Sequence, residues 1–310
     1  MVKEKDDLVV SIQCMVYNHE PYLRQCLDGF VMQKTNFKFE AIVHDDVSTD
    51  GSVAIIREYA AKYPDIIKPI YETENQYSKK DGSLDKIMKD ACRGKYIAIC
   101  EGDDYWTDPF KLQKQVNFLD EHQLYSAYAT NSKIIDKDGN QIRLFSNKES
   151  REIYNMNEIV EKRQFHTASV LWRNRCYRDI CPKYHWDTYI WCYLLTKGKI
   201  WYDNAITCVY RKAEQGVTST TPRISWIEVV ENWSNILLEQ FGGKYLTYTS
   251  TYLSLTRDIL NLLVLNNTFA VDDKNVLTKK YKQYANWKIN IKNIPFILKL
   301  FLIKLIKYIK

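Results

Sequence analysis

The sequence predicts an α/β fold with a mostly parallel sheet flanked by helices. Apolar, strand-like runs alternate with helical patterns over the first 135 residues, and the run at 8–17 is almost continuously apolar. Parallel strands that are buried on both faces have such continuous apolar runs. Strands separated by helices of this length form βαβ units, which determines the predicted fold class.

Each expected element has a local signal. A helical pattern opens at Pro21, a second opens at Asp50-Gly51-Ser52, and a third stops at Gly94. Asp108 followed by Pro109 predicts an N-cap and a proline in the first helical turn. Strands are expected at 8–17, 39–44, 66–71, 96–100, 125–135, 165–173 and 199–211. Helices are expected from 21, from 50, and at 85–92, 108–122, 187–197, 224–241 and 246–266.

The composition excludes several classes of protein. The chain has 310 residues, of which 45% are hydrophobic, and its 10 Gly and 7 Pro argue against collagen-like or long disordered segments. The net charge is +6, but residues 274–310 contain many lysines and no acidic residue. A nucleic-acid-binding domain carries its basic surplus on the folded body, so we expect no nucleic-acid partner.

Cysteine usage and the chain's N-terminal residues favour a reducing, cytoplasmic compartment. No pair among the 8 cysteines has the CxxC spacing of a zinc ribbon or a thioredoxin-like motif. Residues 1–7 are charged and lack the apolar core of a signal peptide. We find no uncharged apolar stretch long enough to span a bilayer.

Acidic residues follow two of the predicted strands. Asp45 and Asp46 come after the second strand, and Glu101, Asp103 and Asp104 come after the fourth. Ligands of open α/β sheets bind at these carboxyl ends, and crowded carboxylates favour a bound cation. Mg²⁺ or Mn²⁺ shared with substrate phosphates is therefore one interpretation, and a solvated acidic turn is the other. Neither GxGxxG after the first strand nor GxxxxGK[ST] is present, which argues against dehydrogenases and P-loop proteins.

Three strings in series resemble the family 2 nucleotide-sugar glycosyltransferases of GT-A fold. They are Cys14-Met-Val-Tyr-Asn-His-Glu-Pro-Tyr-Leu, His44-Asp-Asp-Val-Ser-Thr-Asp-Gly-Ser and Glu101-Gly-Asp-Asp-Tyr-Trp. A fainter resemblance continues through Phe165-His-Thr-Ala-Ser, Trp186-Asp187 and the segment 210–219. It implies a GT-A domain over 1–222, with a nucleotide-binding half at 1–135 and an acceptor half at 136–222.

The resemblance implies five nucleotide-binding residues. Tyr17 would pack on the nucleobase, and Asp46, with Asp45 beside it, would contact the base or the ribose. Asp103 would lie near the ribose, and Arg211 lies on the segment that closes over the diphosphate. Asp50, outside this set, would cap the following helix and brace its loop.

The resemblance also implies the metal site and the catalytic base. Asp104 is the first expected ligand of Mn²⁺ or Mg²⁺, with Asp103 and Glu101 as further ligands, and Asp187 matches the general base. One departure is Ala213, which stands where family members often carry a His available to the metal. The implied reaction is inverting sugar transfer from a nucleotide-diphosphate donor, most simply a UDP-sugar, to a glycan or lipid-linked acceptor in surface polysaccharide synthesis.

The C-terminal part lies outside the resemblance. We expect a helical extension at 223–272 and a basic, membrane-associating tail at 273–310. Within 295–310, four lysines fall on one sector of a helix whose remaining surface is apolar, which suits an anionic membrane surface. The alternative is a helix packed on protein. With a membrane-bound tail, the chain is expected to act at the cytoplasmic face of the membrane.

Two other functions stay open from the sequence. A sugar nucleotidyltransferase usually has a Gly-rich basic loop after the first strand, which this chain lacks. The chain could also be a degenerate relative that binds a nucleotide or a glycan without catalysis. Ala213 favours this alternative, whereas the presence of Asp104 and Asp187 argues against it. For His166, a structural hydrogen bond is favoured over a ligand role.

Overall fold

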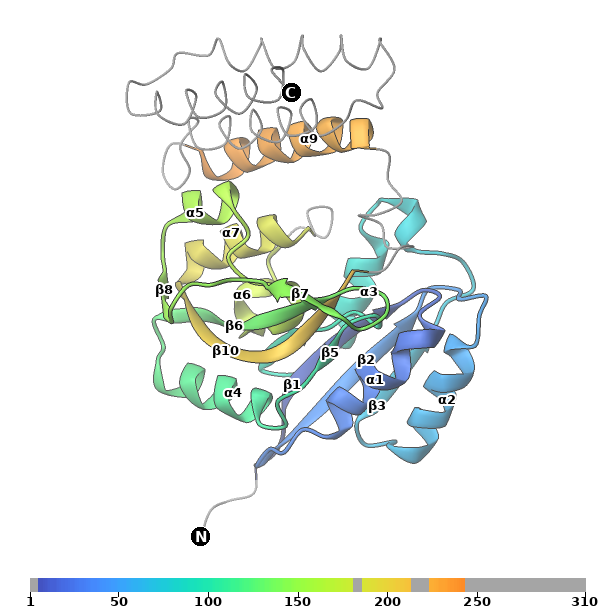
Figure 1. Ribbon diagram of the computed structural model, residues 1–310. Helices are drawn as coiled ribbons and strands as arrows, with labels where there is room; N and C mark the ends of the chain where they lie inside the picture. The colour runs from blue at the N-terminus through green and yellow to red at the C-terminus, as the bar shows by residue number, and fades with distance from the viewer. Residues whose placement is uncertain (1–4, 181–185, 213–222, 243–310) are drawn as a thin grey trace, which may run out of the picture. The chain divides into compact units, whose positions relative to one another are not determined.

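The computed structural model describes residues 5–180, 186–212 and 223–242. The chain divides into two compact units: Met1–Tyr154 with Arg163–Glu214, and Asn155–Lys162 with Gln215–Lys310. The first unit holds all eight predicted site residues and also the sheet, whose strands are labelled in Figure 1. In the second unit, the described elements are the helices α5 (Met156–Glu161) and α9 (Arg223–Phe241).

The described strands form one sheet in the order β3-β2-β1-β4-β9-β6-β10-β5, with β7 beside β6 and β8 beside β10. They are β1 (Lys5–Val16), β2 (Phe37–Asp45), β3 (Ile67–Tyr71), β4 (Tyr96–Ile99), β5 (Tyr105–Trp106), β6 (Tyr125–Ile135), β7 (Gln141–Leu144), β8 (Arg151–Ile153), β9 (Leu171–Arg173) and β10 (Lys199–Arg211). Parallel pairing joins β3, β2, β1 and β4, and also β6 with β10. The α/β fold class is confirmed.

Helices cover both faces of the parallel part of the sheet (Figure 1). Those of the first unit are α1 (Glu20–Val31), α2 (Ser52–Lys62), α3 (Ser83–Ala91), α4 (Lys111–Glu121), α6 (Asn174–Tyr177) and α7 (Asp187–Lys197), with 3-10 turns η1 (Tyr77–Lys79) and η2 (Thr167–Ser169). The chain advances from β1 to β3 and then returns to β4. Because such crossovers are right-handed, α1 and α2 lie on one face and α3 on the other.

Two expectations about local structure need correction. The predicted strand at 165–173 is interrupted by η2, where Nδ1 of His166 accepts a hydrogen bond from the main-chain N–H of Ala168, and only β9 remains extended. The helix expected from Asp108 begins at Lys111, because the Asp108 carboxylate instead accepts from the main-chain N–H of Phe110 and forms a turn. The strand and helix bounds predicted at 125–135, 187–197 and 199–211 are confirmed.

Strand direction was also not fully predicted. Short strand β9 lies between β4 and β6 and is antiparallel to both, and β5, β7 and β8 also pair in antiparallel fashion. The sheet is therefore parallel in its first half and mixed beyond β4. An apolar run indicates that a strand is buried, but it carries no information about the direction of its neighbour.

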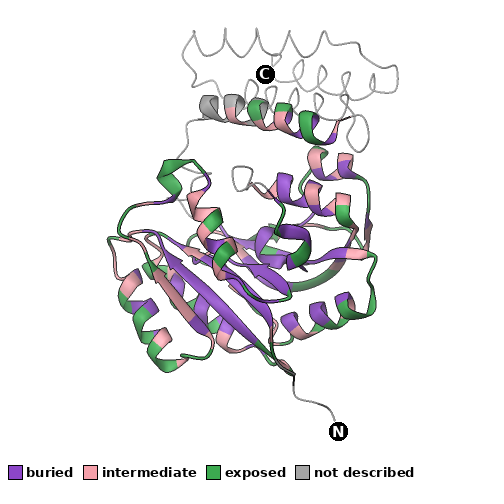
Figure 2. Cartoon of the chain, turned by 180° about the vertical axis from the view of Figure 1, so that it is seen from behind, coloured by how far each residue is buried: buried purple, intermediate pink, exposed green. Residues whose placement is uncertain are grey.

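Buried residues lie along the strands of the sheet and on the helix faces that pack against it (Figure 2). Phe30 of α1 and Trp106 of β5 are both buried and pack edge to face, with ring centroids 5.0 Å apart. Gly29 permits this approach, since a Cβ there would lie 2.9 Å from the Trp106 main-chain nitrogen. The strand that follows the acidic loop is thereby held against α1. The cysteines in the described part are all buried free thiols.

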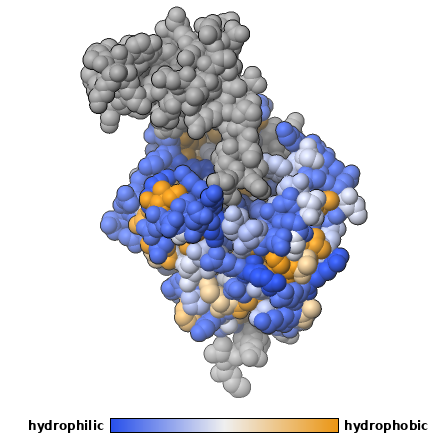
Figure 3. All heavy atoms as spheres, turned by 45° about the vertical axis from the view of Figure 1, so that its right-hand side comes forward, coloured by the Kyte–Doolittle hydropathy of each residue, from blue (hydrophilic) through white to orange (hydrophobic). Residues whose placement is uncertain are grey.

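Small apolar patches on the face shown in Figure 3 are separated by hydrophilic side chains. Within the described residues, no helix has both the length and the hydropathy needed to cross a membrane. The predicted helix at 246–266, the predicted tail at 295–310 and Ala213 lie outside the described residues.

Candidate active site

Strand register brings the loops after β1, β2 and β4 to one edge of the sheet. Val16, the last residue of β1, is paired with Asp45 of β2, and Gln13 of β1 is paired with Ile99 of β4. The segments that begin at Tyr17, Asp46 and Glu101 therefore leave the sheet at the same edge, where ligands of open α/β sheets bind.

The loops after β1 and β2 are tied together by reciprocal hydrogen bonds. Asp50 accepts from the main-chain N–H groups of Ser52 and Glu20, and the Glu20 carboxylate accepts from the N–H of Gly51 at 2.7 Å. Asn18, in the left-handed region with φ 55°, accepts from the N–H of Thr49. Hydrogen bonding lowers the pKa of Asp50 even though partial burial opposes this shift. These hydrogen bonds confirm that Asp50 braces the loop, whereas the N-cap of α2 is Gly51 and not Asp50.

The three predicted nucleotide-binding residues in these loops differ in their surroundings. Tyr17 is 50% exposed, so its ring is open to a ligand. Asp45 is buried, with Oδ2 accepting from the N–H of Ser48 and Oδ1 having no partner among the described residues. Asp46 is also buried, and its carboxylate accepts from the main-chain N–H groups of Gln76 and Tyr77 at 2.6 and 3.0 Å. Asp46 thus holds the loop that contains η1.

The acidic loop after β4 turns tightly at Gly102. A Cβ at Gly102 would lie 2.7 Å from Nδ1 of His19, so a larger residue there would require the His19 side chain to move. Asp104 is buried, and its Oδ1 accepts a 2.9 Å hydrogen bond from the main-chain N–H of Arg211. The side chain of Arg211 donates from Nε to the main-chain oxygen of Asp103 at 3.3 Å. The end of β10 therefore holds the acidic loop in place.

The carboxylates of this loop are crowded and desolvated. Burial, followed by repulsion from Asp187 and Asp103, raises the pKa of Glu101 to about 8. Burial also raises the pKa of Asp104 well above its usual range, with Asp103 and Glu101 adding repulsion. Glu101 Oε2 is buried without a hydrogen-bond partner in the described part of the chain. A cation would relieve both the desolvation and the repulsion, so this donor set fits a divalent metal.

A preformed three-ligand cage is absent from the described residues, in which no group of three or more His, Cys, Asp and Glu is placed to hold a metal. Mg²⁺ and Mn²⁺ in phosphate-transfer sites are commonly held by one or two carboxylates together with substrate phosphates and water. The acidic loop fits this second arrangement, with oxygen donors from Asp104, Asp103 and Glu101.

His166 lies beside the acidic loop in a structural role. Its ring stacks on Tyr210, with centroids 4.2 Å apart, and its Nδ1 is 3.7 Å from Oδ2 of Asp104. Burial lowers the pKa of His166 to about 3. The imidazole is therefore neutral, and its contact with Asp104 is not an ion pair. The hydrogen bond from Ala168 agrees with the structural alternative favoured by the sequence.

Asp187 is the first residue of α7, and its side chain is 28% exposed. Oδ2 accepts a 3.0 Å hydrogen bond from Thr167 Oγ1 and forms a 3.1 Å ion pair with Arg163. Both contacts fall on the same oxygen, while Oδ1 makes no hydrogen bond within the described residues. Since Asp187 also raises the pKa of Glu101, the two carboxylates belong to one electrostatic cluster.

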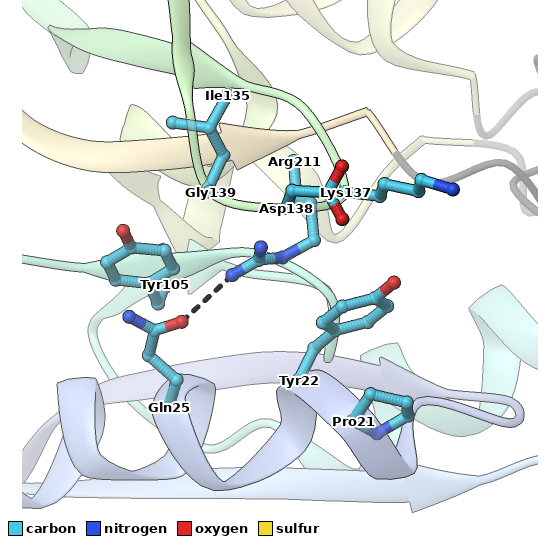
Figure 4. A pocket seen from close by; sticks show the side chains of 9 residues that line it. All are labelled: Pro21, Tyr22, Gln25, Tyr105, Ile135, Lys137, Asp138, Gly139 and Arg211. Atoms are coloured by element: carbon cyan, nitrogen blue, oxygen red, sulfur yellow. Dashed lines mark hydrogen bonds between the residues drawn. The ribbon is translucent and has the colours of Figure 1, made fainter.

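A cavity of about 700 Å³ lies on the α1 side of Arg211 (Figure 4). Arg211 is 7% exposed, and its Nη2 donates to Gln25 Oε1 at 2.9 Å. Its guanidinium carbon lies 4.6 Å from the Tyr22 ring centroid. The Arg211 side chain thus faces the cavity, while its main chain contacts Asp104.

Sequence reasoning missed several contributors to the site. Thr167 and Arg163 hold Asp187, and Gln25 and Tyr22 hold Arg211. Thr167 was within the fainter family-like string, which could have pointed to it. Gln25 is 186 residues from Arg211, and no local pattern links the two.

This mixed sheet flanked by helices has a GT-A-like fold. The structure of S. aureus TarS residues 1–349 in complex with UDP-GlcNAc supports that fold, with a TM-score of 0.63 at 16% identity. The similarity covers 89% of this chain and 81% of TarS 1–349. The profile of glycosyl transferase family 2 matches residues 11–176, more than half of the sequence. The chain therefore belongs to glycosyl transferase family 2.

Curated relatives are similar to part of the chain. An uncharacterised protein of Mycobacterium tuberculosis is 39% identical over 173 residues, which is 56% of this chain and 49% of the relative. The poly(ribitol-phosphate) beta-glucosyltransferase of Bacillus spizizenii is 34% identical over 115 residues, which is 37% of this chain and 18% of the relative. The chain thus spans about half the length of the first relative and a smaller part of the second.

Proposed function

We propose that this chain transfers a sugar from a nucleotide-diphosphate donor to a hydroxyl group of a glycan or lipid-linked acceptor. The observation that carries the proposal is the acidic loop, in which buried Asp104 is held by Arg211 and crowded by Glu101 and Asp103. The TarS complex supports a UDP-sugar as the first donor to test. The name of the Bacillus spizizenii relative supports a surface polymer as the acceptor.

Asp187 is the proposed general base. Thr167 and Arg163 orient its carboxylate through Oδ2, which leaves Oδ1 for the acceptor hydroxyl. Oδ1 takes the hydroxyl proton as the oxygen attacks the anomeric carbon and the bond to the nucleoside diphosphate breaks. A positioned base of this kind contributes roughly 10²–10⁴-fold to the rate. Direct displacement with one base inverts the anomeric centre.

The nucleotide-binding roles proposed for the chain follow the same edge of the sheet. Exposed Tyr17 is available to stack on a base, and Asp45 and Asp46 line the loop beside it. Asp104, Asp103 and Glu101 would hold Mn²⁺ or Mg²⁺. The metal, when bound, neutralises negative charge that develops on the departing diphosphate.

The proposed function is tested by nucleoside diphosphate release from UDP-, GDP- and dTDP-sugars, with and without Mn²⁺. We expect release with one donor class, loss of at least 10²-fold in Asp187→Asn, and no effect in Asp90→Asn, an exposed residue of α3 paired with Lys86. Nucleotide binding without turnover in the wild-type chain would instead support the non-catalytic scaffold. Cleavage of nucleoside triphosphates to sugar nucleotides would support the nucleotidyltransferase.

The proposed location is the cytoplasmic face of the membrane, reached through residues 295–310. Their four lysines and wide apolar surface support attachment to anionic lipid. Flotation of the full chain with vesicles containing phosphatidylglycerol tests this, with Lys→Ser changes at 304, 307 and 310 expected to reduce binding. Equal flotation of the variant and the wild-type chain would contradict it.

A further inference from the structure

The cavity beside Arg211 is open to solvent and has the volume of a small-molecule pocket. Its volume of about 700 Å³ lies within the roughly 300–1,000 Å³ typical of small-molecule pockets. The lining residues are Pro21, Tyr22, Gln25, Tyr105, Ile135, Lys137, Asp138, Gly139 and Arg211. Of the eight predicted site residues only Arg211 lines the cavity, and Tyr17 and Asp46 do not. The Arg211 side chain is therefore assigned to this cavity, in place of the nucleotide-binding role expected from the sequence.

Arg211 presents a pre-organised cation to this cavity. Its Nη2 and Nε donate to neutral acceptors, the Gln25 side-chain oxygen and the Asp103 main-chain oxygen. Within the described residues, Nη1 makes no hydrogen bond, and the guanidinium has no carboxylate at ion-pair distance. The hydrogen-bond partners of this nearly buried cation are neutral, while its charge also acts on the Asp104 carboxylate. A cation without a directly bonded carboxylate is favourable for an incoming anion. The planar guanidinium suits carboxylate and phosphate groups in particular.

Two tyrosines flank this cation. Figure 4 shows the Arg211 guanidinium between the rings of Tyr22 and Tyr105, whose centroids lie 4.6 and 5.8 Å from its central carbon. The aromatic rings limit the conformations of Arg211 and supply flat apolar surface next to a fixed positive charge. Flat aromatic surfaces of this kind suit the C–H face of a sugar ring.

The rim of the cavity adds further polar groups from the turn between β6 and β7. Lys137 and Asp138 are exposed there, next to Gly139, which adopts φ 89°. Together with Arg211, the lining therefore carries two positive charges and one negative charge. This balance favours an anionic ligand that also has hydroxyl groups for Gln25 and the tyrosines.

We propose that this cavity binds an anionic saccharide, a sugar or polyol that carries a carboxylate or a phosphate, separately from the nucleotide-sugar donor. Arg211 contacts the anion, and Tyr22 and Tyr105 contact the sugar or polyol. This inference goes beyond glycosyl transfer and does not depend on turnover.

Calorimetric titration of the full chain tests the proposal with four probes. They are a uronic-acid-containing oligosaccharide, a glycerol phosphate oligomer, a neutral oligosaccharide of equal length and inorganic phosphate. We expect at least tenfold tighter binding of one or both anionic oligomers than of the neutral one, and the stronger of the two identifies a carboxylate or a phosphate source. The same Kd is expected in the presence of saturating UDP and Mn²⁺, because the sites are separate.

Variants locate the binding in the cavity. Arg211→Gln and Tyr22→Leu are each expected to weaken the anionic oligomer at least tenfold. If Arg211→Gln fails to fold, the affinity of Tyr22→Leu for the anionic oligomer tests whether binding occurs in the cavity. Lys62→Ser removes one positive charge from an exposed position on α2, outside the cavity, and is the control that is expected to have no effect. Absence of binding, equal binding of neutral and anionic oligomers, displacement by UDP, or unchanged binding in Tyr22→Leu would each overturn the proposal.

Discussion

The main-chain N–H of Arg211 donates a 2.9 Å hydrogen bond to Oδ1 of Asp104, across 107 residues of sequence. This contact links the last residue of β10 to the acidic loop after β4. Because the donor is a main-chain group, Asn at position 104 can still accept the bond through its own side-chain oxygen. Substitution there can therefore remove the charge while the loop stays attached.

Asp104→Asn is expected to remove the negative charge of this side chain while keeping its hydrogen bond to the main chain of Arg211. Without divalent metal, the variant should unfold at the same or a higher temperature than the wild-type chain, since a buried and crowded carboxylate is removed. Addition of Mn²⁺ should raise the unfolding temperature of the wild-type chain and leave the variant unchanged. Thermal unfolding in EDTA and in MnCl₂ measures both. Equal stabilisation of the two proteins by Mn²⁺ would place the metal elsewhere.

Thr167→Val is expected to lower kcat about tenfold with little change in KM. The substitution preserves shape but removes the 3.0 Å hydrogen bond to Asp187, so the carboxylate loses part of its orientation. Steady-state nucleoside diphosphate release provides the measurement.

The matched control for this variant is Thr130→Val. Thr130 is equally buried and hydrogen-bonds to Thr207 at 2.6 Å within the sheet. Its substitution should cost stability, about 1 kcal/mol, without lowering kcat. Similar losses of kcat in both variants would mean that Thr167 acts through general stability rather than through Asp187.

Lys111→Met is expected to stabilise the fold at neutral pH. Lys111 is fully buried, 4.4 Å from the Trp106 ring centroid, and burial lowers its pKa to about 8. The folded chain then releases this proton near pH 8, while the unfolded chain keeps it to about pH 10.5, so this lysine makes wild-type stability rise between these values. The displacement corresponds to an upper bound of about 3 kcal/mol at pH 7.

Chemical denaturation from pH 7 to 10.5 measures this effect as the difference between variant and wild type. The variant should be more stable at pH 7, and its advantage should shrink as the pH rises through 8. Lys114→Met, an exposed position on the same helix, is the control and should show no such trend. A constant difference across this range would mean that Lys111 is not the group responsible.

Local patterns accounted for most of the fold. Strand β6 and helix α7 are continuous runs with clear boundaries, and their predicted bounds agree with the structure. The direction of β9 could not be predicted, because a strand of three residues between β4 and β6 has no local signal for antiparallel pairing. The departures at Asp108 and His166 have one cause, since side-chain hydrogen bonds there form turns in place of regular structure.

The site was predictable in part. The positions of Asp45, Asp46 and the acidic loop at the ends of predicted strands indicated a site without reference to any family. Parallel register brings such strand ends together. Asp187 was singled out only through family resemblance. Its contact with Thr167 and the contact between Arg211 and Gln25 depend on tertiary packing that no spacing in the sequence encodes.

The proposed metal–diphosphate site at the acidic loop is tested most directly by calorimetric binding of UDP, GDP and dTDP to the full chain. Each nucleotide is titrated with Mn²⁺ and with EDTA, into the wild type and into Asp104→Asn. We expect one nucleotide to bind at least tenfold more tightly with Mn²⁺, and this gain to disappear in Asp104→Asn. Equal affinity with and without Mn²⁺ in both proteins, or no binding of any nucleotide to the folded chain, would contradict a metal–diphosphate site at the acidic loop.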